Sequence, residues 1–333
     1  MFSDPFFASI FLACLASLVC TIPGTLLMLR GVALMSDAIS HTLLLGIVMT
    51  FLCAKTLHSP LLFLGAIGSG LCMVFVVERV IQTQKITEDV AIGIVFPVFF
   101  SLGVIVISCF VNDIHLDVDM VLLGDLAFAP FDRFIVQGTD YGPWGLWMLS
   151  GVLFVHLIVL FCLYYTWQYT FFDKEGASIA GISVRRVHYS LMALTAISAV
   201  AACHVVGSIV VVALMITPPA IAYFLTERMF PLLATSILIG IAATLCGYGG
   251  AQWVDVSIAG SIALAHGIFF VGVFLCTPKK GLVGRWIRNR NYRCIYARKL
   301  VEEYGEKQQM PAGDIEHIAH EFGWSVEFVR SLF

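Results

Sequence analysis

Nine stretches of mostly apolar residues follow one another along the first 277 positions of this chain. A helix that crosses a bilayer needs about 20 such residues, because it rises about 1.5 Å per residue. Only 12% of the residues are charged, whereas soluble domains carry about 25%. The pattern predicts an all-α polytopic membrane protein with helices at 6–29, 31–54, 60–80, 90–111, 146–171, 188–203, 205–225, 231–250 and 257–277.

The number of helices and their orientation depend on two further observations. The sixth and seventh stretches are separated only by the residues between His204 and Gly207, so eight helices remain an alternative if one stretch is re-entrant. With the C-terminus in the cytoplasm, only Lys55 and Arg133 of the 19 basic residues fall outside. Because Lys and Arg collect in cytoplasmic loops, we expect the N-terminus outside and the C-terminus inside.

The composition changes after the last apolar stretch. We expect a membrane domain over residues 1–278, a basic juxtamembrane segment over 279–299 that contacts anionic membrane lipid, and a small helical cytoplasmic module over 300–333. The module has a helix-turn-helix pattern with Gly323 at its turn. Its second half carries Arg330 as its only basic residue, beside Glu327, which argues against nucleic acid and favours a protein-contact or regulatory role.

Asp37 and His41 lie inside the second apolar stretch. Being four residues apart, they share one face of a helix. An aspartate within a membrane helix costs about 3 kcal/mol or more, so such residues are usually functional. Carboxylate and imidazole together suit a divalent metal ion, and Ser36 and Ser40 flank the pair as candidate pathway or supporting groups. A polar clamp between helices is an equally good interpretation of the spacing alone.

A metal site made from this pair would be incomplete. Two side chains cannot fill a tetrahedral coordination shell. A two-fold dimer with this helix at its axis would supply two aspartates and two histidines. His204 and His266 lie near or within apolar stretches and are weaker pathway candidates, for which a polar contact between helices is the stronger alternative.

Several classes of function are excluded or disfavoured by missing motifs. The chain contains no Gly-Lys dipeptide, so it has no phosphate-binding loop for ATP, and it has no His-Glu-x-x-His metalloprotease motif. Its ten cysteines form no Cys-x-x-Cys pair, which favours small buried hydrophobic groups over a structural zinc site. These absences disfavour ATP binding by a phosphate loop and intramembrane proteolysis, and we expect no permanently bound cofactor and no enzymatic activity of the chain itself.

Two polar loops are candidate contact surfaces for partners. The outer loop from 112 to about 144 is acidic and contains Asp113, His115, Asp117 and Asp119; it is either a funnel or docking surface for a cation-delivering partner or a solvated loop. The inner loop 172–186 has the pattern of a short amphipathic helix with a break at Gly181. It is either an element gripped by a motor subunit or an ordinary connection.

Five segments resemble, in order, motifs of the ABC-3 permeases, which are the membrane subunits of zinc, manganese and iron ABC importers. The segment containing Asp37 and His41 resembles the family's hallmark motif. The five segments are 35–46, 88–96, 121–126, 172–182 and 205–220. Two departures are mild: Ser36 stands where the family often has glycine, and Pro218-Pro219 replaces a more usual Pro-Ala.

The resemblance implies a mechanism that the residues alone do not give. A separate cytoplasmic ATPase dimer would bind the coupling helix, whose candidate residues are Asp173, Glu175, Gly176 and Gly181. An extracytoplasmic metal-binding protein would dock outside, and the permease would pair with a second copy or a paralogue in the bacterial plasma membrane. Asp37 and His41 would bind Zn²⁺, Mn²⁺ or Fe²⁺ transiently; the sequence does not name the metal. An ion-coupled secondary metal carrier without an ATPase is the alternative.

Overall fold

The computed structural model describes residues 5–55, 60–83, 86–110, 126–136, 139–226 and 228–277. The chain divides into two compact units, 1–271 and 272–333, and the helical bundle belongs to the first. Within the described residues, nine helices are long and apolar enough to cross a membrane, as the sequence predicts. They are α1 (Pro5–Arg30), α2 (Leu34–Ala54), α3 (Pro60–Ile81), α4 (Glu88–Phe110), α6 (Trp144–Phe172), α8 (Val184–Val206), α9 (Ser208–Leu225), α10 (Met229–Val254) and α11 (Ile258–Cys276).

Helices α8 and α9 are separate, which decides between eight helices and nine. Gly207 stands between them with φ +82°, and its N–H donates to the Cys203 carbonyl oxygen at 3.0 Å. Only glycine adopts this conformation without strain, so the continuous apolar run is interrupted there. The break lies where the sequence analysis places it.

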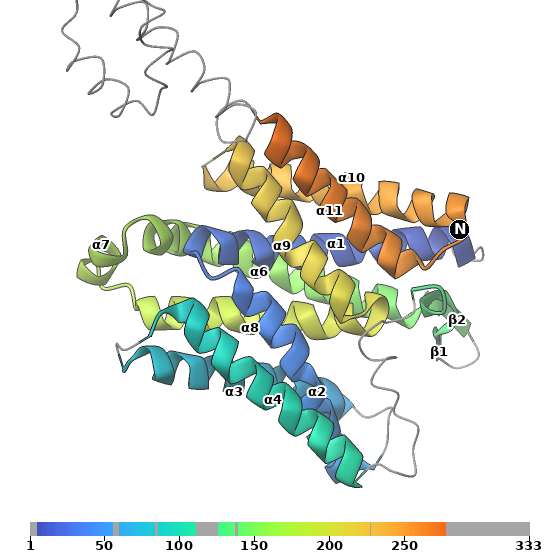
Figure 1. The fold of residues 1–333 in the computed structure, drawn as a ribbon, viewed down its shortest axis with the longest axis horizontal. Helices are drawn as coiled ribbons and strands as arrows, with labels where there is room; N and C mark the ends of the chain where they lie inside the picture. The colour runs from blue at the N-terminus through green and yellow to red at the C-terminus, as the bar shows by residue number, and fades with distance from the viewer. Residues whose placement is uncertain are drawn as a thin grey trace, which may run out of the picture. The chain divides into compact units, whose positions relative to one another are not determined.

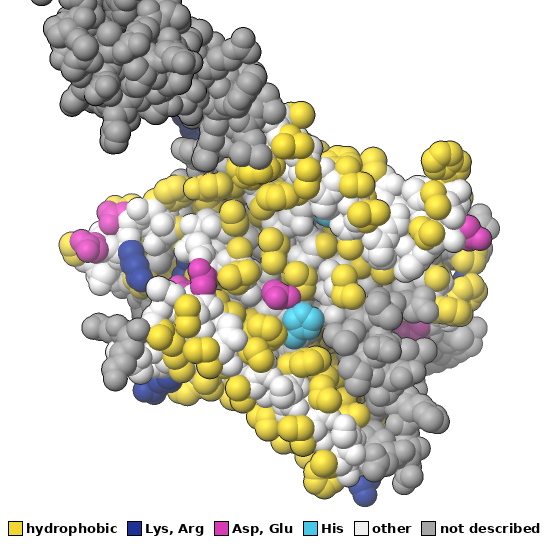
Figure 2. All heavy atoms as spheres, viewed as in Figure 1, with side chains coloured by type: hydrophobic (Ala, Val, Ile, Leu, Met, Phe, Trp, Pro, Cys, Tyr) yellow, Lys and Arg dark blue, Asp and Glu magenta, His cyan; other side chains and the backbone are white. Residues whose placement is uncertain are grey.

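Helix α1 lies at the centre of the bundle (Figure 1). It packs against α6, α8, α9 and α10, whereas α2 packs against α3, α4, α8 and α9. Large side chains of α1 such as Leu12 and Leu26 are completely buried, but Phe161 and Tyr165 of α6 are 87% and 81% exposed. Figure 2 shows how many hydrophobic side chains cover the viewed face, as expected of a surface surrounded by lipid.

Polar contacts join neighbouring helices at several points. The Ser69 hydroxyl of α3 donates to the Thr42 carbonyl of α2 at 2.9 Å. The His156 ring of α6 is fully buried, and its Nε2 lies 2.6 Å from the Ser198 hydroxyl of α8. His156 is thus a contact between helices.

The two ends of the bundle differ. At one end α6 leads through the short helix α7 (Lys174–Ile179) into α8; we call this the α7 end. At the other end the chain forms the 3-10 helix η1 (Ala129–Phe131) and an antiparallel hairpin of β1 (Arg133–Val136) and β2 (Thr139–Pro143) (Figure 1). The Gly142 N–H and the Arg133 guanidinium, 2.6 Å away, lower the pKa of Asp140. Part of the predicted outer loop therefore has regular structure.

Candidate metal site

The candidate site begins at the first turn of α2. Helix α1 ends at Arg30, three residues turn the chain, and α2 starts at Leu34, which places Asp37 in its first turn. The amino end of a helix carries a partial positive charge that stabilises a nearby carboxylate. The start of α2 thus offsets part of the cost of keeping an acidic group within the bundle.

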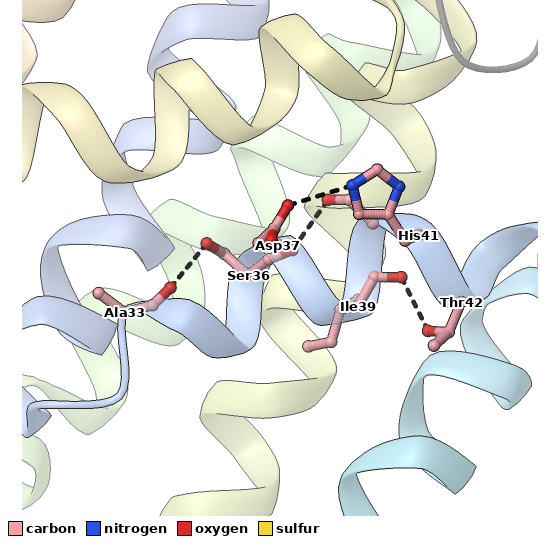
Figure 3. Close-up of polar contacts among 7 residues, drawn as sticks. Ala33, Ser36, Asp37, Ile39, His41 and Thr42 are labelled. Atoms are coloured by element: carbon pink, nitrogen blue, oxygen red, sulfur yellow. Dashed lines mark hydrogen bonds and ion pairs between the residues drawn. The ribbon is translucent and has the colours of Figure 1, made fainter. Parts of the chain in front are cut away.

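Asp37 and His41 point toward each other on one face of α2 (Figure 3). The His41 Nε2 lies 3.2 Å from the Asp37 Oδ1, and the two side chains are 28% and 36% exposed, respectively. In a single chain this pair is only partly buried, and no lysine or arginine among the described residues forms an ion pair with Asp37. Figure 2 shows acidic and histidine side chains side by side in the middle of a largely apolar face.

Two aromatic rings of α4 border the histidine. The Phe96 ring stacks on His41 at a centroid distance of 6.1 Å, and the Phe100 ring meets it edge-on at 6.0 Å. These contacts restrict the orientation of the imidazole and exclude water from one side of it. The ring is therefore held beside Asp37 while the other side of the pair stays open.

The two serines that flank the pair are bonded to their own helix. The Ser36 hydroxyl donates to the Ala33 carbonyl at 2.8 Å, and the Ser40 hydroxyl donates to the Ser36 carbonyl at 2.9 Å (Figure 3). Both side chains are buried, at 1% and 4% exposure. The protons of both hydroxyls are therefore already used in hydrogen bonds within α2.

The two histidines predicted as pathway candidates lie elsewhere in the bundle. His266 on α11 is fully buried, with its Nδ1 2.9 Å from the Ile262 carbonyl oxygen. His204 is exposed in the last turn of α8. No hydrogen bond or ring contact between described residues joins either one to Asp37 or His41. The outer-loop candidates Asp113, His115, Asp117 and Asp119 lie outside the described residues, as does the module over 300–333.

One chain supplies only part of a coordination shell. Within the part of the chain that the structure describes, no group of three or more His, Cys, Asp or Glu side chains is placed to hold a metal ion. A carboxylate and an imidazole 3.2 Å apart can bind one divalent ion together. Further ligands must come from outside this set.

Helix α7 is a short, capped and largely exposed helix at one end of the bundle. The Asp173 carboxylate caps it by accepting from the Gly176 N–H at 2.8 Å, and a side chain at Gly176 would overlap with that carboxylate. Gly181 has φ +81° and ends the helical turn, as the predicted break requires. Ile179 is 89% exposed, Glu175 is also exposed, and Ala177 anchors the helix by being buried.

Comparisons with known proteins identify the family. The sequence matches the ABC 3 transport family over residues 3–277. The chain belongs to the ABC 3 transport family. It is 38% identical to the manganese transport system membrane protein MntD of Bacillus subtilis (strain 168) over 83% of this chain and 94% of MntD. It is also 38% identical to the zinc transport system membrane protein TroD of Treponema pallidum (strain Nichols) over 83% and 75% of the respective chains.

Solved structures agree with this assignment. PsaBC from Streptococcus pneumoniae, solved in complex with Fab, is similar with a TM-score of 0.70 and 28% identity, over 86% of this chain and 96% of that one. A putative metal-chelate type ABC transporter in an inward-facing conformation has the same fold with a TM-score of 0.59, at 16% identity and over 80% and 84% of the chains. The helical architecture of the described residues is thus shared with both structures, and the family match favours an ATP-driven transporter over an ion-coupled carrier.

The structure of this ABC 3 family member also contains contacts that the sequence analysis missed. The Arg30 Nη1 donates to the Nδ1 of His188, and the Tyr189 hydroxyl donates to the Glu78 carboxylate. These contacts join α1, α3 and α8 at the α7 end. The only sequence signal was the presence of charged residues at the ends of apolar stretches, which does not reveal which residues meet.

Proposed function

We propose that this chain is the transmembrane permease subunit of an ATP-driven importer of a divalent transition metal ion, Mn²⁺, Zn²⁺ or Fe²⁺, in a bacterial plasma membrane. The observation that carries the proposal is the Asp37/His41 pair, open on one side of α2, in a family member similar to permeases named for manganese and zinc transport. Hydrolysis of ATP takes place in a partner chain, because this sequence has no phosphate-binding loop.

The pair forms half of a shared site. A second permease copy or a paralogue, related by a two-fold axis near α2, contributes its own carboxylate and imidazole. The resulting set of two Asp and two His side chains fits the four-coordinate geometry of Zn²⁺ and leaves room for water around Mn²⁺ or Fe²⁺. The exposure of both side chains in the single chain supports this arrangement.

Transport then follows alternating access around this site. An extracytoplasmic metal-binding protein delivers the ion at the end of the bundle that carries the β1–β2 hairpin, and an ATPase dimer binds α7 at the cytoplasmic end. The residues that stabilise α7 or lie on its exposed surface are Asp173, Glu175, Gly176 and Gly181. In this orientation the N-terminus is outside and the C-terminus inside, in agreement with the distribution of basic residues.

The test is metal uptake into proteoliposomes that contain the permease with its ATPase and binding protein. We expect ATP-dependent uptake of at least one of ⁵⁴Mn²⁺, ⁶⁵Zn²⁺ and ⁵⁵Fe²⁺, and competition among the three ranks their affinities. Asp37→Asn should abolish uptake because the neutral amide is a poor metal ligand. Asp255→Asn, a matched change at the exposed carboxyl end of α10, should leave it intact. Uptake that needs an ion gradient and no ATP would overturn the proposal.

A further inference from the structure

The α7 end contains a polar cluster that the site does not use. We call Arg30, Glu78, Glu88, His188 and Tyr189 the α7-end cluster. Arg30 is the last residue of α1, Glu78 lies near the end of α3, and Glu88 is the first residue of α4. His188 and Tyr189 lie in the early turns of α8, just after α7.

Hydrogen bonds tie the start of α8 to two other helices. Arginine only donates, so the bond from Arg30 makes the His188 Nδ1 an acceptor and leaves the proton on Nε2. The adjacent Tyr189 hydroxyl donates to Glu78. A displacement of α8 at His188 and Tyr189 is therefore transmitted to the ends of both α1 and α3.

Charges extend the cluster to α4 and to α7 itself. Glu88 and Glu78 both attract the Arg30 guanidinium. Lys174, the first residue of α7, interacts electrostatically with Glu88 and with His188. Both acids thus interact with a cation of the chain itself, so the cluster is suited to hold helices together and not to bind a metal ion.

The link from Arg30 to the candidate metal site is short and hydrogen-bonded. Residues 31–33 join α1 to α2, and the Gly31 and Val32 N–H groups donate to carbonyl oxygens of α1 at 3.1 and 3.0 Å. The Met35 N–H donates to the Val32 carbonyl at 3.0 Å. Since Asp37 lies in the next turn, a displacement of Arg30 passes to the metal-binding face of α2.

We propose that Arg30 is a coupling residue, which transmits displacement of α7 and the start of α8 through His188 to the turn before Asp37 and His41. This inference rests on the proposed function, because it assigns Arg30 to the step between ATP use and opening of the metal site. Arg30 touches no metal ion. It positions α2 according to the state of α7.

The experiment measures ⁵⁴Mn²⁺ uptake and ATP hydrolysis together in proteoliposomes that contain the complete transporter. ⁶⁵Zn²⁺ or ⁵⁵Fe²⁺ replaces ⁵⁴Mn²⁺ if the wild type prefers it. His188→Leu removes the acceptor, whereas the matched variant His188→Asn keeps an acceptor near the position of Nδ1. Arg30→Gln and Arg30→Lys form a second pair at the other end of the contact, so failure of one variant to fold leaves the test intact.

We expect His188→Leu and Arg30→Gln to lower metal uptake per ATP hydrolysed by about tenfold, within the usual range of coupling between sites. His188→Asn and Arg30→Lys should restore most of the ratio, and Arg228→Gln, at an exposed basic residue that precedes α10, should leave it unchanged. If the ratio of uptake to hydrolysis is unchanged, as when both fall in parallel, the coupling role alone is overturned. A wild-type complex that shows no ATP-driven uptake of any of the three metals would overturn the proposed function as well.

Discussion

The Asp37/His41 pair and the α7-end cluster are both polar groups within an apolar bundle, but they differ in how their bonds are completed. The pair has one internal contact of 3.2 Å and remains partly exposed. The cluster joins residues of α1, α3 and α8 by hydrogen bonds and attracts charges on α4 and α7. Polar groups in a membrane protein need partners, so an open pair indicates a ligand or a second subunit, whereas a completed cluster indicates a connection between helices.

The largest effect is expected at the Asp37/His41 pair, the open group of this comparison. If the site is shared, the purified wild-type permease pair should bind one metal ion per two chains. Asp37→Asn should raise the Kd by about 100-fold or more, since each factor of ten corresponds to about 1.4 kcal/mol. Isothermal titration with Mn²⁺ and Zn²⁺ measures both quantities. One ion per chain, with an unchanged Kd in the variant, would contradict a shared site at Asp37.

The second prediction concerns the α7-end cluster, whose hydrogen bonds are completed within the chain. Tyr189→Phe deletes one hydroxyl and the bond to Glu78, and a hydrogen bond to a charged group contributes about 1.5 kcal/mol. We expect Tm to fall by about 3 °C, as is usual for a domain of this size. The Kd for the metal should stay unchanged, because the contact between Arg30 and His188, which leads to the turn before Asp37, remains intact. A metal affinity that falls along with Tm would mean that the Tyr189–Glu78 contact also reaches the metal-binding face of α2.

The comparison also explains what the sequence could predict. The nine helices of the described residues were predictable because a bilayer requires long apolar segments. The contact between Asp37 and His41 was predictable because residues four apart lie on one helix face. The partners of the cluster are 158 residues apart for Arg30 and His188 and 111 apart for Glu78 and Tyr189. No local period connects such residues, so only the packing of the helices reveals the cluster.

The aromatic border of the site and the hairpin were missed for a related reason. Phe96 and Phe100 are two of many aromatic residues in apolar helices, and nothing in α4 marks them as neighbours of His41. The hairpin over 133–143 carries no alternation of polar and apolar residues that would mark it, since Phe134, Ile135 and Val136 follow one another in β1. In both cases the information lies in contacts between segments.

A third prediction tests whether α7 must be an ordered helix for the ATPase to bind it. Asp173→Ala removes the cap that accepts from the Gly176 N–H, and loss of such a cap costs about 1 kcal/mol. We expect the affinity of the ATPase for the permease in nanodiscs to fall by about fivefold. Asp173→Ser keeps a capping oxygen and should restore the affinity. If Asp173→Ser binds as poorly as Asp173→Ala, the carboxylate itself contacts the ATPase.

The smallest expected effect comes from Ser40, which lies beside the pair but is bonded to its own helix. Its hydroxyl donates to the Ser36 carbonyl at 2.9 Å and its side chain is 4% exposed, so Ser40→Ala removes a group that already has a partner. Alanine also favours the helix by a few tenths of a kcal/mol. We expect the Kd for the metal to change by less than about twofold. Ser69→Ala, which removes a bond between α3 and α2, is the matched control for altered packing. A tenfold rise in Kd for Ser40→Ala but not for Ser69→Ala would mean that the Ser40 oxygen reaches the ion, and that each chain supplies three ligands to the site and not two.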